Sequence, residues 1–534
     1  MSRNGRLSLR KPSVFVSGFG FQVVILLAFV LSCLTFFGWA CRKGLWFLSF
    51  CDEGEHLLGG RMLNEGGRLY VSYVDSHGPV IFMLSQLYGA LFGWHFPQGA
   101  RLFLPALALM AATCLSVTSA LSDVRHRVLA STVFIGGVAS YWLMDAFYMI
   151  SFYPVAGFLA VCLLALFVVP VWFGKTPSVL SSALAGMCLI LILGCAYAYG
   201  PGMFLIVIPA LWLLAREQGG RAIKAFAGGA VLTVLLLGLW FWRYSDFGSF
   251  VVFHILFNQI AYAPFIHFGP KTFLVSLVPS FRGEEFYPTL AHLILAASLP
   301  MLLYRRPNRN RMAILIGFAG ILLLNARAAA GFKDGQTLIM AFALAGLALG
   351  GCPERQADSS RMLSRSALAG AIGMVLVFWG SSHLATNTPF NWTYHESTHK
   401  PPYTIYQPID DAISLKVRSL VPPGQPILML PYMPEFYWMA DRRPPYGYYE
   451  YLPWDAVYAR HPVPGYPHDL CQKLLTDPPP LIVYTPETDP TSLTVRPFFA
   501  CIKERLATMY MPVEGFPSLH VLRPRKNQSR VSPP

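Results

Sequence analysis

The chain has few charged residues for its length. Of its 534 residues, 13% are charged and 54% are hydrophobic, whereas about a quarter of an average soluble protein is charged. This shortage excludes an ordinary soluble enzyme. Apolar runs of about 16–25 residues recur over roughly the first 385 positions, and each can cross a hydrocarbon core of ~30 Å as a helix. The sequence therefore predicts a polytopic α-helical membrane protein.

Several familiar motifs are also absent. The sequence contains no P-loop and no pair of Cys-x-x-Cys motifs, so neither of the sites that these motifs build is indicated. A nucleotide-sugar donor is not expected, because nothing in the predicted cytoplasmic loops resembles its site. The apolar run at 13–40 is too long for a cleavable signal peptide and has no clear small-residue cleavage site.

Acidic residues are outnumbered by basic ones. The chain has 27 Asp and Glu against 41 Lys and Arg, for a net charge of +14. Such an excess is found in nucleic-acid-binding proteins, but it is also what the positive-inside rule produces in the loops of a membrane protein. We favour the second explanation and expect no nucleic-acid partner.

The basic loops set the predicted topology. Placing the N-terminus, 122–127 and 304–311 in the cytoplasm gives about eleven transmembrane helices and puts the remaining loops outside. Residues 78–93 are short for a span and are expected to form a helix along the outer membrane surface, because counting them as a span would move the basic loops outside. The expected spans are 13–40, 101–121, 127–144, 147–172, 179–197, 202–215, 225–243, 288–304, 312–326, 337–350 and 366–384.

The composition changes after residue 386. Residues 387–534 are rich in Pro, Tyr and charge and contain no spanning run. We predict a transmembrane domain at 1–386, with a first outer loop at 41–100, and a small extracytoplasmic α/β domain at 387–534. In the latter, strands are expected at 426–430, 481–485 and 519–522, and helices at 411–420 and 500–509. Cys471 and Cys501 could pair in an oxidising compartment or remain free thiols.

Ionisable residues gather at one face of the predicted bundle, whereas the spans contain almost none. A transporter needs such groups near the bilayer midplane, so chemistry at the outer membrane surface fits better than transport. A flippase or transporter of a lipid-linked glycan and a non-catalytic assembly subunit remain as alternatives. The residues at this outer face include Asp52, Glu53, Asp75, His77, Asp145 and Lys333.

The first outer loop carries a recognisable pattern. A span is followed by DEGEH at 52–56, then by SHGP at 76–79, and then by the predicted surface helix. This order resembles the GT-C glycosyltransferases, and within them the bacterial branch of lipid A aminoarabinose transferases and protein O-mannosyltransferases. The family pattern D-E-x-x-[YH] opens the same loop, and a motif such as Lys-Pro-Pro or Lys-Gly-Pro closes it. The resemblance covers 1–386, and 387–534 matches in type only.

The resemblance implies a reaction. Members of this family transfer a sugar, hexosyl or pentosyl, from a polyprenyl-phosphate donor to an acceptor hydroxyl with inversion, which needs a general base. Asp52 lies at the position of that base. Glu53 and Asp145 are expected to support it, and Asp145 could also hold a metal.

The leaving phosphate needs positive charge. His77 stands where the aminoarabinose branch has Lys, so it could donate to phosphate or bind a metal. Lys333 is a second candidate for the phosphate. Arg68 and Arg61 could bind lipid phosphate, although pairing with Glu65 is the favoured interpretation for them.

No cofactor is certain from the sequence. A divalent metal (Mg, Mn or Zn) could be held by Asp52, Asp75, His77 and Asp145, although Asp75 could instead cap the surface helix. The expected partners are the bilayer, a polyprenyl-phosphate-linked sugar and a glycan, lipid or protein acceptor. The resemblance places the protein in a bacterial cytoplasmic (inner) membrane with its site on the periplasmic side. We expect the tyrosine-rich stretch 444–451 to face the membrane domain rather than to stack on sugar.

Overall fold

The computed structural model describes ten ranges of the chain. They are 15–44, 51–94, 97–121, 123–144, 150–265, 335–350, 411–432, 434–484, 499–516 and 520–525. Asp145, Lys333 and the expected spans 288–304, 312–326 and 366–384 lie outside the described residues.

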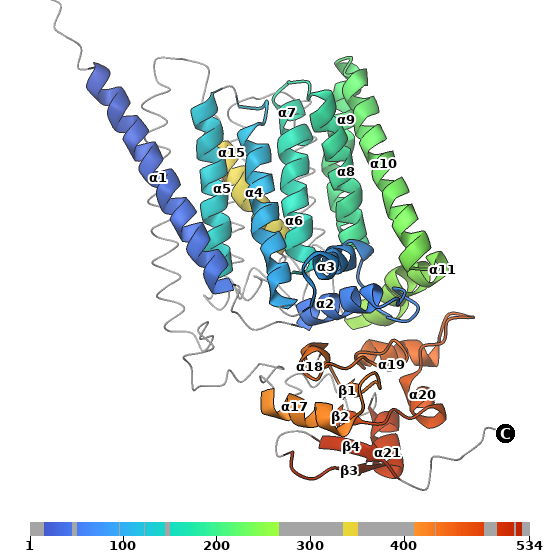
Figure 1. Ribbon diagram of the computed structural model, residues 1–534. Coiled ribbons are helices and arrows are strands. Elements are labelled where there is room, and N and C mark those ends of the chain that lie inside the picture. Colours follow the sequence, from blue (N-terminus) through green and yellow to red (C-terminus); the bar gives the residue numbers. More distant parts are fainter. Residues whose placement is uncertain are drawn as a thin grey trace, which may run out of the picture.

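Long apolar helices run alongside one another in a bundle (Figure 1). Each expected span within the described ranges coincides with a helix, so these predictions are confirmed at the level of secondary structure. The bundle helices are α1 (Phe15–Gly44), α4 (Phe103–Ser116), α5 (Val124–Met144), α6 (Phe152–Leu163) with its continuation α7 (Val169–Trp172), α8 (Val179–Cys195), α9 (Gly200–Arg216), α10 (Gly220–Tyr244) and α15 (Gly335–Gly350).

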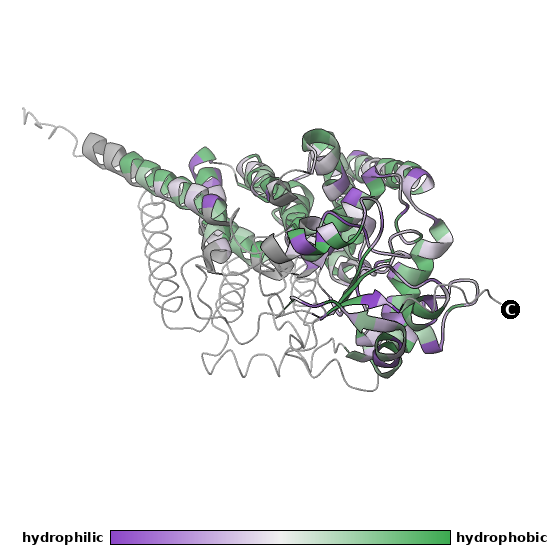
Figure 2. Ribbon diagram, turned by 60° about the horizontal axis from the view of Figure 1, so that its bottom comes forward, coloured by the Kyte–Doolittle hydropathy of each residue, from purple (hydrophilic) through white to green (hydrophobic). Residues whose placement is uncertain are grey.

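The bundle has a buried centre and an apolar exterior. The stretch Phe152–Trp172 is entirely buried, whereas much of the Gly220–Tyr244 window is exposed. On α10 the exposed side chains include Leu235, Leu239 and Trp242, as expected for a surface that faces lipid. Hydrophobic residues predominate along the bundle helices in Figure 2. The described residues thus form a helical membrane protein.

A proline explains an irregular turn between α6 and α7. The π-helical turn Leu164–Val168 comes directly before Pro170, whose missing N–H cannot bond to the preceding turn. The carbonyl of Ala165, five residues before this proline, instead accepts a hydrogen bond from the Thr118 hydroxyl at 2.7 Å. Thr118, which follows α4, therefore supplies a hydrogen-bond donor to the irregular turn.

Two helices lie across one end of the bundle (Figure 1). They are α2 (Cys51–Asn64) and α3 (Pro79–Phe92). The α3 helix was predicted as a surface helix, whereas α2 was treated as loop. Gly59 and Gly60 weaken the helical signal of α2, but they allow its close approach to α3. A Cβ on Gly59 would lie 2.6 Å from the Phe82 ring, and one on Gly60 would lie 2.6 Å from Cβ of Ser85.

The helical segment after α10 lies at the same end. It comprises α11 (Phe247–Phe250), η4 (Val251–Leu256), η5 (Asn258–Tyr262) and η6 (Ala263–Phe265). Phe247–Phe265 is long and apolar enough to span a membrane, but it contacts the C-terminal residues along its length. Phe257 lies 5.2 Å from Tyr458, and Tyr262 lies 4.9 Å from Trp454, between ring centroids. This segment therefore lies between the bundle and the C-terminal residues.

Residues 411–525, as far as they are described, form an α/β unit that we call the C-terminal unit. Its sheet has the order β1-β2-β4-β3, with β1 parallel to β2 and the other pairs antiparallel. The elements are α17 (Asp411–Leu420), β1 (Leu428–Leu430), α18 (Pro434–Met439), α19 (Pro453–Arg460), α20 (Leu470–Thr476), β2 (Ile482–Tyr484), α21 (Ala500–Met509), β3 (Tyr510–Pro512) and β4 (His520–Pro524). The predicted strands coincide with β1, β2 and β4, and both predicted helices are present.

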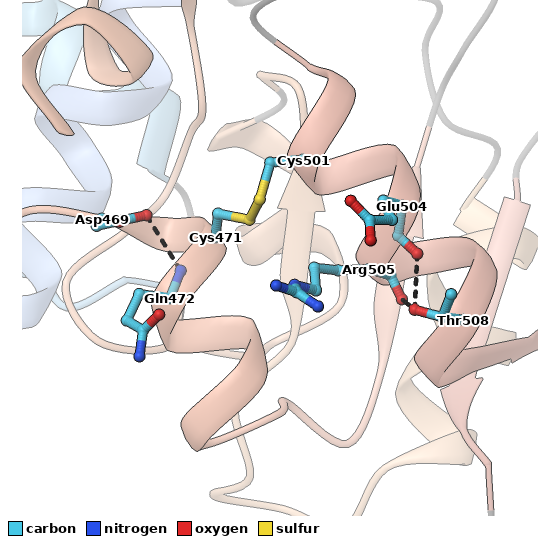
Figure 3. Close-up of a disulfide and its surroundings, with 7 residues drawn as sticks. All are labelled: Asp469, Cys471, Gln472, Cys501, Glu504, Arg505 and Thr508. Atoms are coloured by element: carbon cyan, nitrogen blue, oxygen red, sulfur yellow. Dashed lines mark hydrogen bonds between the residues drawn. A yellow bond between two sulfur atoms is a disulfide. The ribbon is translucent and has the colours of Figure 1, made fainter. Parts of the chain in front are cut away.

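A disulfide joins two helices of this unit. Cys471 on α20 is bonded to Cys501 on α21 (Figure 3). Asp469 caps the start of α20 by accepting the backbone N–H of Gln472 at 3.1 Å. Of the two alternatives that the sequence left open, the structure shows the paired one.

Candidate functional site

The site begins at the first turn of α2. Asp52 is partly exposed there, whereas Glu53 is buried. Two carboxylates in the first turn are favourable because the N-terminal end of a helix carries partial positive charge. The same turn thus offers one carboxylate to its surroundings and turns the next one inward.

Glu53 anchors α2 to the bundle. It and Arg101, in η1 (Pro97–Leu102), are both 0% exposed. Arg101 Nε donates to Oε1 of Glu53 at 2.8 Å, and an Nη atom donates to Oε2. Oε1 also accepts the backbone N–H of Ile150 at 3.0 Å. Glu53 therefore holds three parts of the chain together beside Asp52.

Four ionisable side chains meet behind this turn. His77 Nδ1 lies 2.8 Å from Oε1 of Glu55 and 2.9 Å from Oδ1 of Asp75. His56 Nε2 lies 3.7 Å from the same Glu55 oxygen. Glu55 and Asp75 are only 2% and 4% exposed. We call these four residues the carboxylate–imidazole cluster. Asp75 and His77 were predicted as site residues, whereas Glu55 and His56 were not.

Burial and mutual attraction set the charges of this cluster. Burial raises the pKa of Glu55 to about 8, and the charges of Asp75 and Asp52 act in the same direction, against the attraction of His77. For His77 burial acts to lower the pKa, but Glu55 and Asp75 together raise it well above its usual value. Burial by itself would raise the pKa of Asp75, yet His77 lowers it overall. At neutral pH the cluster therefore holds an imidazolium beside an ionised Asp75.

His56 is held in a form that can bind a cation. Burial, followed by the charge of His77, lowers the pKa of His56 to about 3, so its ring is neutral. Its Nδ1–H donates to the carbonyl of Ile150 at 3.3 Å. The Nε2 atom then carries a lone pair, and this buried atom has no hydrogen-bond partner within the described part of the chain. Metal-binding histidines are typically oriented in this way by a backbone carbonyl.

The cluster could accommodate a divalent metal. Glu55, His56 and His77 offer ligand atoms that all lie within 4.8 Å of one another. Imidazole nitrogens with a carboxylate oxygen suit Zn²⁺ and similar ions. His77 would have to lose its proton to serve as a ligand. The candidate set thus includes His77 from the prediction and adds two residues from DEGEH.

The loop that carries His77 is fixed from two sides. The carbonyl of Ser76 accepts hydrogen bonds from His254 Nδ1 and Asn258 Nδ2, both at 2.8 Å. Gly78, two residues after Ser76, lies directly on the end of α8. A Cβ added to Gly78 would collide with the carbonyl of Gly194. Glycine at this position therefore lets the loop approach the bundle.

The C-terminal unit covers the cluster with aromatic residues. Tyr449 stacks on Tyr73 at 4.9 Å between ring centroids, and its hydroxyl lies 2.9 Å from Oδ2 of Asp75. Tyr432 donates to Oε2 of Glu55 at 2.8 Å. The expectation that 444–451 faces the membrane domain is confirmed at Tyr449.

The remaining predicted residues lie elsewhere. Arg68 is exposed and donates to the carbonyl of Ser245. Arg61 pairs with Glu65 at 2.9 Å, as favoured from the sequence, and also with Asp441 of the C-terminal unit at 2.7 Å. Asp145 and Lys333 are outside the described residues.

An apolar cavity lies beside α3, the helix that follows the His77 loop. It has a volume of about 450 Å³ and lies among α3, α4, α6, α8 and α10. Val80, three residues after His77, contributes to its wall, and Asn64, Gln86 and Trp240 supply polar atoms. The α3 helix thus connects the loop that carries His77 with a cavity lined mainly by apolar side chains.

Comparison with known proteins shows which solved structures share this fold. No protein-family model matches the chain, and no curated protein matches it either. Among solved structures, ArnT from Cupriavidus metallidurans bound to undecaprenyl phosphate is 14% identical, with a TM-score of 0.55, over 95% of this chain and 99% of that chain. The apo structure of the same protein gives 14% identity and a TM-score of 0.51, over 95% and 98% of the two chains.

A more distant similarity is to an archaeal protein. The oligosaccharyltransferase AglB from Archaeoglobus fulgidus, in complex with an inhibitory peptide and a dolichol-phosphate, gives 14% identity and a TM-score of 0.39 over 85% of this chain and 69% of that chain. The agreement with the two ArnT structures shows that the chain shares the fold of ArnT. The fold inferred from DEGEH and SHGP is therefore confirmed.

Proposed function

We propose that this protein is an inverting glycosyltransferase. It would move a sugar from a polyprenyl-phosphate donor to a hydroxyl of a lipid, glycan or protein acceptor at the outer face of the cytoplasmic membrane. The observation that carries this proposal is the carboxylate–imidazole cluster at the end of the bundle, whose His77 lies on the loop that leads into α3. The α3 helix also lines an apolar cavity of about 450 Å³. The undecaprenyl phosphate bound to ArnT, which shares the fold, supports the same donor class.

The residues have complementary roles in this reaction. The partly exposed carboxylate of Asp52 takes the proton from the acceptor hydroxyl. The acceptor oxygen forms the new bond to the anomeric carbon while the bond from that carbon to the phosphate oxygen breaks. His77, as an imidazolium, stabilises the charge that develops on the leaving polyprenyl phosphate.

Other residues would support these two. Glu53 and Arg101 hold Asp52 in place through α2, and we retain Asp145 in a supporting role. Lys333 and Arg68 remain proposed contacts to phosphate. A divalent metal held by Glu55, His56 and a deprotonated His77 would, when bound, supply positive charge to the leaving phosphate in place of the imidazolium.

The disulfide supports the proposed orientation. Disulfides persist in oxidising compartments and are rare in the cytosol, so the bond between Cys471 and Cys501 favours a periplasmic C-terminal unit. The contacts of Tyr432 and Tyr449 with the cluster support a site at the same membrane face. We propose a multi-pass inner-membrane protein with about eleven spans and its site on the periplasmic side.

Sugar transfer by purified protein tests the proposal. Wild type, Asp52→Asn and the control Asp477→Asn, which removes an exposed carboxylate of the C-terminal unit, would be assayed with a panel of polyprenyl-phosphate sugars and a membrane-lipid extract. We expect transfer by wild type and the control, and a loss of about a hundredfold in Asp52→Asn, as for removal of a general base. Transfer that survives in Asp52→Asn would move the base to another carboxylate. Donor binding without any transfer would favour a flippase or an assembly subunit.

A further inference from the structure

Two tyrosines of the C-terminal unit reach the centre of the carboxylate–imidazole cluster. Tyr432 and Tyr449 are 377 and 394 positions away from Glu55 in the chain. Both are buried. Their hydroxyls lie 2.8 Å and 3.1 Å from the same atom, Oε2 of Glu55, and Tyr449 also lies 2.9 Å from Oδ2 of Asp75.

The tyrosine hydroxyls contact one oxygen of each carboxylate and leave the other oxygen to His77. Oε2 of Glu55 and Oδ2 of Asp75 face the tyrosines. The other two oxygens, Oε1 of Glu55 and Oδ1 of Asp75, face His77 Nδ1 at 2.8 Å and 2.9 Å. A carboxylate with one oxygen fixed in this way has little freedom to turn the other oxygen away. The C-terminal unit therefore determines which oxygens the membrane domain presents to His77.

The tyrosines are themselves held firmly. Tyr432 forms an antiparallel bridge with Glu450, the residue after Tyr449. The backbone N–H of Val74, next to Asp75, donates to the carbonyl of Gly447 at 3.2 Å. Gly447 has a φ of +80°, and a Cβ there would lie 3.1 Å from the carbonyl oxygen of Ser72, so this close docking requires glycine.

If Tyr432 and Tyr449 served only to dock the C-terminal unit on the membrane domain, their hydroxyls would not be needed. The Tyr449 ring stacks on Tyr73, whose own hydroxyl donates to the Glu55 carbonyl at 2.7 Å. Phenylalanine would keep the stacking area. It would, however, leave a carboxylate oxygen buried without its partner, which is costly. The hydroxyls are therefore directed at the two carboxylates specifically.

We propose that Tyr432 and Tyr449 are positioning residues of the active site, which act by fixing the carboxylates of Glu55 and Asp75 toward His77. This inference rests on the proposed function and adds that the C-terminal unit completes the catalytic centre. Residues that orient the groups of a site in this way typically contribute about ten- to a hundredfold to metal affinity or activity.

Full-length protein with single hydroxyls removed tests the proposal. The variants are Tyr432→Phe, Tyr449→Phe and both together. The matched control is Tyr448→Phe, since Tyr448 is also buried but stacks on His468 at 4.0 Å. Four quantities would be measured in each: kcat and KM for a polyprenyl-phosphate sugar, the Kd for Zn²⁺ by competition with a chromogenic chelator, and the thermal unfolding midpoint.

We expect the double variant to lose about ten- to a hundredfold in kcat and in Zn²⁺ affinity, with the single variants in between. The KM for the donor should change by less than about threefold, because removal of an interaction that acts on the chemical step lowers kcat. Tyr448→Phe should match wild type in kcat and in Zn²⁺ affinity. If the double variant does not fold, the single variants decide the outcome.

The two proposals fail in different ways. Double-variant protein that keeps the wild-type kcat and Zn²⁺ affinity overturns the positioning role and leaves the glycosyltransferase standing. Equal losses in Tyr448→Phe also overturn it, because they indicate general destabilisation. Wild type that binds Zn²⁺ but transfers no sugar refutes the proposed function, and the Zn²⁺ affinities then decide the role of the tyrosines. Wild type that does neither overturns both.

Discussion

Replacing Arg101 by methionine should strongly destabilise the protein. Methionine preserves much of the side-chain volume, but it leaves Glu53 without the guanidinium that contacts both of its oxygens. Both side chains are 0% exposed, so water cannot replace the lost partner. Breaking a fully buried ion pair by removal of one partner costs about 3–5 kcal/mol. Among the described residues, Glu53 then keeps the backbone N–H of Ile150 at 3.0 Å as its hydrogen-bond partner, so we expect a loss in that range.

The free energy of unfolding would be measured by SDS titration in mixed micelles. Arg418→Met is the control, because the pair of Arg418 with Asp441 is about half exposed, at 49% and 44%, and should contribute at most about 1 kcal/mol. The double variant Glu53→Gln/Arg101→Met should recover part of the loss, since it removes the uncompensated charge. A loss in Arg101→Met no larger than in Arg418→Met would refute the role of this pair as the anchor of α2.

Three further predictions concern the cluster, the disulfide and the SHGP loop. The pKa of Glu55 is raised from 4.5 to about 8, so between these pH values the folded protein binds one proton more than the unfolded chain, and wild type loses stability as the pH rises. The thermal midpoint of Glu55→Gln relative to that of wild type should therefore increase from pH 5 to pH 8. Midpoints of the two proteins that change in parallel with pH would contradict this. Replacing Cys471 and Cys501 by alanine opens a link across a separation of 30 residues, which should lower the unfolding free energy by about 3–4 kcal/mol in urea titration under oxidising conditions, and an unchanged value would speak against a structural disulfide. Gly78→Ala should displace the His77 loop and reduce sugar transfer by at least about tenfold, whereas Gly228→Ala, where an added Cβ meets nothing within 4 Å, should retain it; equal rates would show that the loop tolerates a side chain.

The bundle could be predicted because its signal is local. Long apolar runs have few alternatives to a membrane helix, and the expected spans within the described ranges coincide with helices. The strands β1, β2 and β4 were found for a similar reason, since each is a short apolar run between turn residues. By contrast, β3 at Tyr510–Pro512 contains a proline, which weakens the signal of a strand.

The site could be predicted only in part. Asp75 and His77 were found from a motif, whereas Glu55 lies three residues after Asp52 in the same stretch and was passed over. Its central place depends on partners that are far away in sequence, such as Tyr432. Arg101 was hidden at the start of an apolar run, and its pairing with Glu53 depends on how η1 meets α2. Such contacts follow from tertiary packing, which local patterns do not encode.

The tyrosine contacts impose an order on biosynthesis. Residues 55 and 75 leave the ribosome long before residues 432 and 449, which contact them in the finished protein. Until the later segment has been made and has docked on the bundle, the two early carboxylates lack the hydroxyls that contact them in the finished protein. A nascent chain with all of its early spans inserted therefore still has an unfinished centre. The protein becomes competent only when nearly the whole polypeptide has been delivered and docked.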